Sequence, residues 1–69
     1  MDTLIASSSL KDKLIILLKN TLKRNINLKY NNDKNIYLVY DNDHDIYLNS
    51  YYIRYDWEID EFLLFKSEV

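Results

Sequence analysis

The chain has 69 residues, a net charge of −2, 48% hydrophobic residues, 14% aromatic residues and no cysteine. This composition is too apolar for intrinsic disorder, and the length allows a single domain that buries only about 60% of its unfolded surface. Disulfides and thiolate zinc sites, the usual staples of small folds, are excluded. Stability is therefore marginal or shared with a partner, and a homodimer is a reasonable default.

Glycine and proline are both absent, although average usage is about 7% and about 5%. Asn, Ile, Lys and Tyr, which use AT-rich codons, are abundant, and this bias indicates an AT-rich genome such as that of a phage or a low-GC bacterium. Without glycine, tight turns must use Asn or Asp for left-handed backbone conformations. Clusters of Asn and Asp therefore mark the turns.

The first predicted element is an amphipathic helix over residues 10–24. Ser9 to Asp12 form a variant of the capping box, in which the Ser9 hydroxyl accepts a hydrogen bond from an early backbone N–H. Apolar residues then recur at intervals of three and four, which indicates one buried helix face. The stripe consists of Leu10, Leu14, Leu17, Leu18, Thr21 and Leu22.

Beyond Asn25 the hydrophobic period changes to two, and a polar loop followed by Ile-Tyr-Leu occurs twice, over residues 30–38 and 40–48. Hairpins folded about Asp33 and Asp43 would bring alternate residues onto one apolar face, on which the helix should pack. That predicted face comprises Ile26, Leu28, Tyr30, Ile36, Leu38, Tyr40, Ile46 and Leu48.

The alternation slips at Asn49-Ser50, which indicates a turn or, preferably, a bulge in one long strand from Asp45 to about Trp57. The final segment suits either a helix or a strand, and we favour a strand. The predicted fold class is α+β, with one N-terminal amphipathic helix packed on a three- to four-stranded antiparallel β-meander. We expect residues 1–69 to form a single domain, with the helix over about 10–24 and the sheet over about 26–66.

Alternate carboxylates in the segment Asp41 to Asp45 could converge on a hard cation such as calcium. As an EF-hand loop the segment fails, because Ile46 and Tyr52 stand where glycine and a bidentate glutamate are required. An Asn- and Asp-rich turn accounts for the same residues. The sequence contains no recognisable catalytic constellation, so we expect a protein that is not an enzyme, with no catalytic or metal-binding residues and no cofactor.

Charge is segregated along the chain: residues 1–30 carry six basic and two acidic residues, whereas residues 31–69 carry three basic and nine acidic ones. The second face of the predicted sheet would present tyrosines with an acidic border, which suits a basic surface on another protein. The predicted partner-binding residues are Tyr37, Tyr47, Tyr52, Asp41, Asp43, Asp45 and Asp56.

In size, AT-biased composition and acidity the chain resembles small phage-encoded host-takeover or anti-defence inhibitors, anti-CRISPR proteins among them. The resemblance implies a viral protein of the host cytoplasm, and the N-terminal residues show neither a signal-peptide pattern nor a membrane span. We expect a non-enzymatic protein-binding module that occludes a basic or nucleic-acid-binding surface of its partner.

Two alternatives stay open. The first is a nucleic-acid-binding protein that contacts phosphates through Lys11, Lys19, Lys23 and Arg24 on the basic helix. It is less favoured, because the tyrosines that could stack on bases belong to the acidic half of the chain. The second alternative is a structural or regulatory homodimer.

Overall fold

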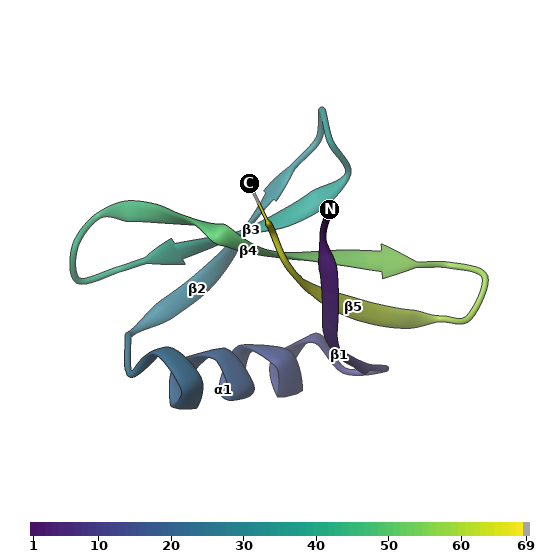
Figure 1. Ribbon diagram of the computed structural model, residues 1–69, viewed down its shortest axis with the longest axis horizontal. Coiled ribbons are helices and arrows are strands. Elements are labelled where there is room, and N and C mark those ends of the chain that lie inside the picture. Colours follow the sequence, from purple (N-terminus) through teal and green to yellow (C-terminus); the bar gives the residue numbers. More distant parts are fainter. Residues whose placement is uncertain (69) are drawn as a thin grey trace.

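The computed structural model describes residues 1–68. Its elements are β1 (Thr3–Ser8), α1 (Lys11–Leu22), β2 (Ile26–Asn31), β3 (Ile36–Asp41), β4 (Ile46–Asp56) and β5 (Glu61–Lys66). The strands form one antiparallel sheet in the order β1-β5-β4-β3-β2. Strands β2 to β5 are a meander, and α1 leads from β1 at one edge to β2 at the other (Figure 1). The α+β class and the antiparallel sheet are confirmed.

Two parts of the predicted architecture are wrong. The helix does not come first, because Thr3–Ser8 precede it as a strand paired with β5, and the sheet therefore has five strands rather than three or four. Most side chains of β1 are exposed. This edge strand is placed by its backbone pairing and carries no clear apolar alternation, which is the pattern that reveals other strands.

The helix begins at Lys11, and its predicted cap is also wrong. The N-cap is Leu10, which has no side-chain cap, and it is the Ser8 hydroxyl rather than Ser9 that accepts the N–H of Leu10, at 3.1 Å. At the other end Lys23 adopts a left-handed conformation with φ 56° and donates its N–H to the Lys19 carbonyl at 2.9 Å. At 12 residues, α1 would extend about 18 Å. No helix within residues 1–68 is long and apolar enough to cross a membrane.

The hydrophobic core lies between α1 and one face of the sheet. Only part of the predicted helix stripe enters it, since Leu14 and Leu18 are buried while Leu10 and Leu17 stay exposed. Each core side chain has at most 2% of its surface exposed: Leu14, Leu18, Ile26, Val39, Ile53 and Leu64. The core therefore joins the helix to four of the five strands.

The predicted register of both hairpins is wrong by one residue. Tyr30 lies opposite Tyr37 rather than Ile36, because the β2–β3 turn contains four residues, 32–35, and Asn31 still belongs to the strand. The β3–β4 turn, 42–45, produces the same shift. Each one-residue slip reverses which face a side chain occupies, and the two slips cancel on passing from β2 to β4. Only β3 is turned over, so that Tyr37 and Val39 face the helix side.

Strand β4 is the long, bulged strand that the sequence predicts. Tyr40 pairs with Tyr47 and Leu38 with Tyr52, so two steps along β3 correspond to five along β4. The extra residues surround Asn49-Ser50, where the alternation slips, which confirms the bulge. The final strand, β5, is confirmed as well.

Candidate functional site

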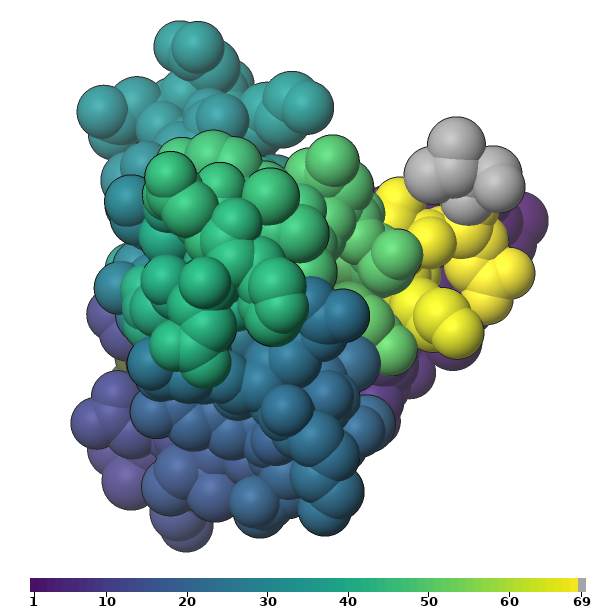
Figure 2. Space-filling view, turned by 90° about the vertical axis from the view of Figure 1, so that its left-hand side faces the viewer, coloured from purple at the N-terminus to yellow at the C-terminus, as the bar shows by residue number. Residues whose placement is uncertain are grey.

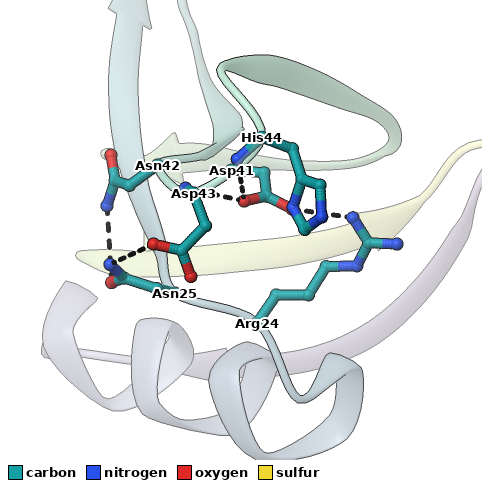
Figure 3. Close-up of polar contacts among 6 residues, drawn as sticks. All are labelled: Arg24, Asn25, Asp41, Asn42, Asp43 and His44. Atoms are coloured by element: carbon teal, nitrogen blue, oxygen red, sulfur yellow. Dashed lines mark hydrogen bonds and ion pairs between the residues drawn. The ribbon is translucent and has the colours of Figure 1, made fainter.

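The acidic segment that follows β3 is built around the buried carboxylate of Asp41, whose side chain is 0% exposed (Figure 3). One oxygen accepts Nη1 of Arg24 at 2.7 Å and lies 2.9 Å from Nδ1 of His44. The other accepts the backbone N–H groups of Asp43 and His44 at 3.0 and 3.1 Å. Burial alone would raise the pKa of Asp41, but the bonds from Arg24 and His44 prevail and lower it from 3.8 to about 2.

Neighbouring polar contacts fasten this turn to the end of the helix. The Asn25 side-chain amide donates to Asp43 at 3.3 Å, and the Asn42 backbone N–H donates to the Asn25 carbonyl at 2.9 Å. In the space-filling view the turn lies directly on the segment that follows α1 (Figure 2). Asp41 is therefore a structural clasp with no free oxygen for a partner. No group of three or more potential metal ligands occurs within the described part of the chain.

The sheet face turned away from the helix holds two of the predicted partner-binding tyrosines. Tyr47 pairs edge-on with Tyr40 at 5.2 Å between ring centroids, and Tyr52 stacks on Phe65 at 5.2 Å. The charges over these rings are positive, because Nζ of Lys29 lies 4.0 Å from the Tyr40 ring and Arg54 lies 5.0 Å from that of Phe65. One carboxylate is also present, because the Tyr52 hydroxyl donates to Asp2. The surroundings of these tyrosines are therefore of mixed charge, with cations over the neighbouring rings.

A second aromatic surface lies on the helix side, where the two outer hairpins part. The β3–β4 ladder ends at the pair Tyr37 and Ile53, while β2–β3 and β4–β5 each continue to their turns. The diverging ends of these hairpins are visible in Figure 1. Between them is a groove of about 530 Å³, which we call the aromatic groove. Its lining comprises Tyr30, Asn35, Tyr37, Tyr55, Trp57 and Phe62.

The rings of the aromatic groove form a continuous row. Tyr30 lies 5.0 Å from Tyr37, Tyr37 lies 6.1 Å from Phe62, and Phe62 lies 4.9 Å from Tyr55, all between centroids in tilted or edge-on arrangements. Such pairs stabilise one another beyond the area they bury, which holds the row in place. Trp57 is 77% exposed and forms no aromatic pair within residues 1–68. It is the ring of the groove that remains free for a ligand.

The two tyrosines at the ends of this row use their hydroxyl hydrogens within the chain. Tyr30 donates to the Asn35 side-chain oxygen at 2.5 Å, and Tyr55 donates to the Asp60 carboxylate. The hydrogen bond to Asp60 is the main reason why the pKa of Tyr55 is raised above 10, with burial and nearby negative charge adding to it. Both hydroxyls are thereby oriented by the turn residue that lies five positions later in the sequence.

The turns that flank the aromatic groove are acidic. The turn 32–35 and the turn 57–60, taken with the strand residues Asp56 and Glu61 on either side of it, contain five carboxylates and one lysine, a net charge of −4. The carboxylates belong to Asp33, Asp56, Glu58, Asp60 and Glu61. Of the predicted partner-binding residues, Tyr37 therefore lines the groove and Asp56 lies in the adjoining hairpin. Asp43 and Asp45 belong to the turn at the other end of β4.

Sequence reasoning missed most of the groove, although a signal for it was present. The repeat begins with Tyr followed by Asn or Asp, and it ends with another Asn or Asp five residues after the Tyr. It occurs a third time, from Tyr55 to Asp60. In all three copies the last residue is left-handed, with φ of 54° or 55° at Asn35, Asp45 and Asp60. The third copy is a sequence signal for the β4–β5 turn and for the left-handed conformation of Asp60.

Two of the four basic residues considered for phosphate contacts are engaged by the chain itself. Arg24 binds Asp41, and Nζ of Lys11 lies 4.7 Å from the centre of the Tyr37 ring. Lys19 on α1 and Lys23 at its C-cap remain exposed. The basic helix therefore offers a smaller free cationic surface than its sequence indicates.

Comparison with known proteins places no relative beside this chain: no family model, curated protein sequence or solved structure matches it.

Proposed function

We propose that this protein is a non-enzymatic binding module that attaches to a basic surface of a partner protein and occludes it, as a small inhibitor does. The surface that we assign to this role is the aromatic groove with its two acidic turns. It differs from the face expected from the sequence, since Tyr47 and Tyr52 lie on the opposite side and Asp41 is buried.

The observation that carries the proposal is the coincidence of exposed aromatic area and negative charge at one end of the molecule. Aromatic side chains supply large contact areas at protein interfaces, and Trp and Tyr are enriched among residues that dominate binding energy. The net charge of −4 on the flanking turns would attract a basic surface and repel nucleic acid. A partner surface that normally holds nucleic acid has this basic character.

The test uses charge reversals at two exposed carboxylates, one at each end of β4. Glu58 lies in the turn beside the groove, and Asp43 lies in the turn at the far end of β4; both are exposed. The protein is immobilised and used to capture partners from a lysate of a low-GC bacterium. We expect Glu58→Lys to reduce capture at least about tenfold, the loss produced by about 1.4 kcal/mol, whereas Asp43→Lys retains it.

Occlusion is then measured on the captured partner. Its nucleic-acid binding should fall when the wild-type protein is added and recover with Glu58→Lys. Equal capture by both variants would remove the groove from the proposal, and capture without competition would leave a binding module that is not an inhibitor. In a mobility-shift assay at low salt the protein alone should retard no nucleic acid; a salt-sensitive shift abolished by Lys19→Glu would favour the basic helix. Light scattering of the purified protein tests the homodimer.

A further inference from the structure

We infer that the aromatic groove is a recognition site for the guanidinium group of an arginine side chain, presented by an exposed segment of the basic partner. The inference rests on the proposed function and specifies its ligand. The groove volume of about 530 Å³ falls within the roughly 300–1,000 Å³ of small-ligand sites. One extended, planar side chain with its neighbouring backbone would therefore fill it.

The tyrosine oxygens of the groove favour a ligand that donates hydrogen bonds. The hydroxyl hydrogens of Tyr30 and Tyr55 are directed at Asn35 and Asp60, so their phenolic oxygens can only accept a hydrogen bond from a ligand. The exposed carboxylate of Glu58 is a further acceptor on the adjoining turn. Arginine presents five N–H donors and no acceptor, which complements these three acceptor groups.

The rings themselves favour a planar cation. A guanidinium stacks on aromatic faces through its charge and its flat shape, and tryptophan is the best ring for this contact. The chain itself makes contacts between a cation and a ring: Arg54 lies over the Phe65 ring on the other face, and Lys11 lies over the Tyr37 ring in the groove. Tyr37 is a ring in the interior of the row. Trp57 stands outside this row, and within residues 1–68 no cation of the chain lies over its ring.

The net negative charge around the groove favours a cation over a nucleic-acid base as the ligand that stacks on its rings. Bases also stack on exposed Trp and Tyr, but they arrive with a phosphate backbone. The five carboxylates of the two flanking turns outnumber Lys34 and Lys11 together. A phosphate would be repelled there, whereas a guanidinium would be attracted by the carboxylates and the π faces at once.

The only tryptophan of the chain lies in the groove, and its fluorescence reports occupancy directly. The probe is the peptide Gly-Arg-Gly-Arg-Gly, compared with the same peptide carrying citrulline, which keeps the planar shape and loses the charge. We expect a saturable change in Trp57 emission with half-saturation in the millimolar range. The citrulline peptide should bind about 5- to 30-fold more weakly, as the loss of a desolvated cation–π contact implies.

Two matched variants locate the contact, followed by backbone NMR shifts because one removes the fluorophore. Trp57→Leu removes the exposed ring of the groove, and Tyr47→Leu removes a ring that is 45% exposed on the opposite face. Trp57→Leu should weaken arginine-peptide binding about 5- to 30-fold, and Tyr47→Leu by less than twofold. Because Trp57 is 77% exposed, its replacement leaves the core intact, which unchanged amide shifts of Ile53 and Leu64 would verify.

Three results would overturn the inference: equal affinity for the citrulline peptide, equal loss in both variants, or saturation of the Trp57 signal by oligothymidine in place of the arginine peptide. Failure of the proposed function has a different signature. In that case the wild-type protein captures no partner, whatever the peptide does. If a partner is captured equally by Trp57→Leu and by the wild type, the binding module stands and the arginine site does not.

Discussion

Replacing Lys23 with glycine should stabilise the protein, because Lys23 ends α1 in the left-handed region with φ 56°. A residue with a Cβ atom loses about 1–2 kcal/mol in this conformation, and glycine does not. The greater freedom of glycine in the unfolded chain returns roughly 0.5–1 kcal/mol of that gain. The net stabilisation is about 0.5–1 kcal/mol. For a domain of this length it corresponds to a rise in Tm of about 2–8 °C.

Lys19→Gly is the matched control, because it removes the same side chain and charge from the last turn of α1 but lies within the helix. Glycine in a helix interior costs about 1 kcal/mol, so this variant should be destabilised. The two variants should differ by about 1.5–2 kcal/mol, or roughly 6–16 °C in Tm, measured by thermal unfolding followed by circular dichroism. If both variants lose stability to the same extent, the backbone conformation of Lys23 is not the origin of the effect.

Two further predictions concern the clasp and the core. Because the folded pKa of Asp41 is about 2 and the unfolded value is near 3.8, its contribution to stability is present above pH 3.8 and is lost as the pH falls toward 2. Urea unfolding at pH 5 and pH 2.5 should therefore show a smaller acid loss in Arg24→Gln, where that pKa returns toward 3.8; an unchanged loss would contradict the ion pair. In the core, Leu18→Ala should cost about 2–5 kcal/mol, whereas Ile16→Ala should cost less than about 0.5 kcal/mol, since their exposed fractions are 1% and 57%. Similar urea midpoints for these two variants would show that the helix packs through another face.

Hydrophobic spacing and clusters of Asn and Asp predicted the helix, the first two turns and the bulge. The three- and four-residue spacing that includes Leu14 and Leu18 located α1 to within two residues at its C-terminus. The Asn- and Asp-rich clusters located the first two turns, because a chain without glycine has no better residues for the left-handed positions. The break in alternation at Asn49-Ser50 located the bulge of β4.

The residues expected to bind a partner were predicted to share one sheet face, but the structure places Tyr37 on the opposite face from Tyr47 and Tyr52. One turn accounts for this difference. Asn31 has the composition of a loop residue, yet it is the last residue of β2, and its side chain accepts the backbone N–H of Lys34 at 3.1 Å. That single position changes the β3 register and moves Tyr37 to the helix side. Composition cannot reveal whether an Asn closes a strand or opens a turn.

The pairing of distant segments lay beyond any local pattern. Tyr30 and Tyr55 are 25 positions apart, and they share a groove because the β3–β4 ladder stops at Tyr37 and the two hairpins then diverge. Likewise, in the sequence Asp41 is one of several acidic residues near a predicted turn. Only the packing of this turn on the segment after α1 brings Arg24 to Asp41 and buries the Asp41 carboxylate.

By itself, the sequence determined the α+β class, the amphipathic helix, the order of the meander strands and the acidic character of the second half. These features depend on residue spacing and composition, which act over a few neighbouring residues. Tertiary structure decided the edge strand β1, the register of β3, the burial of Asp41 and the aromatic groove that contains Trp57. Each of these depends on contacts between segments far apart in the chain, where a shift of one residue exchanges the two faces of a strand.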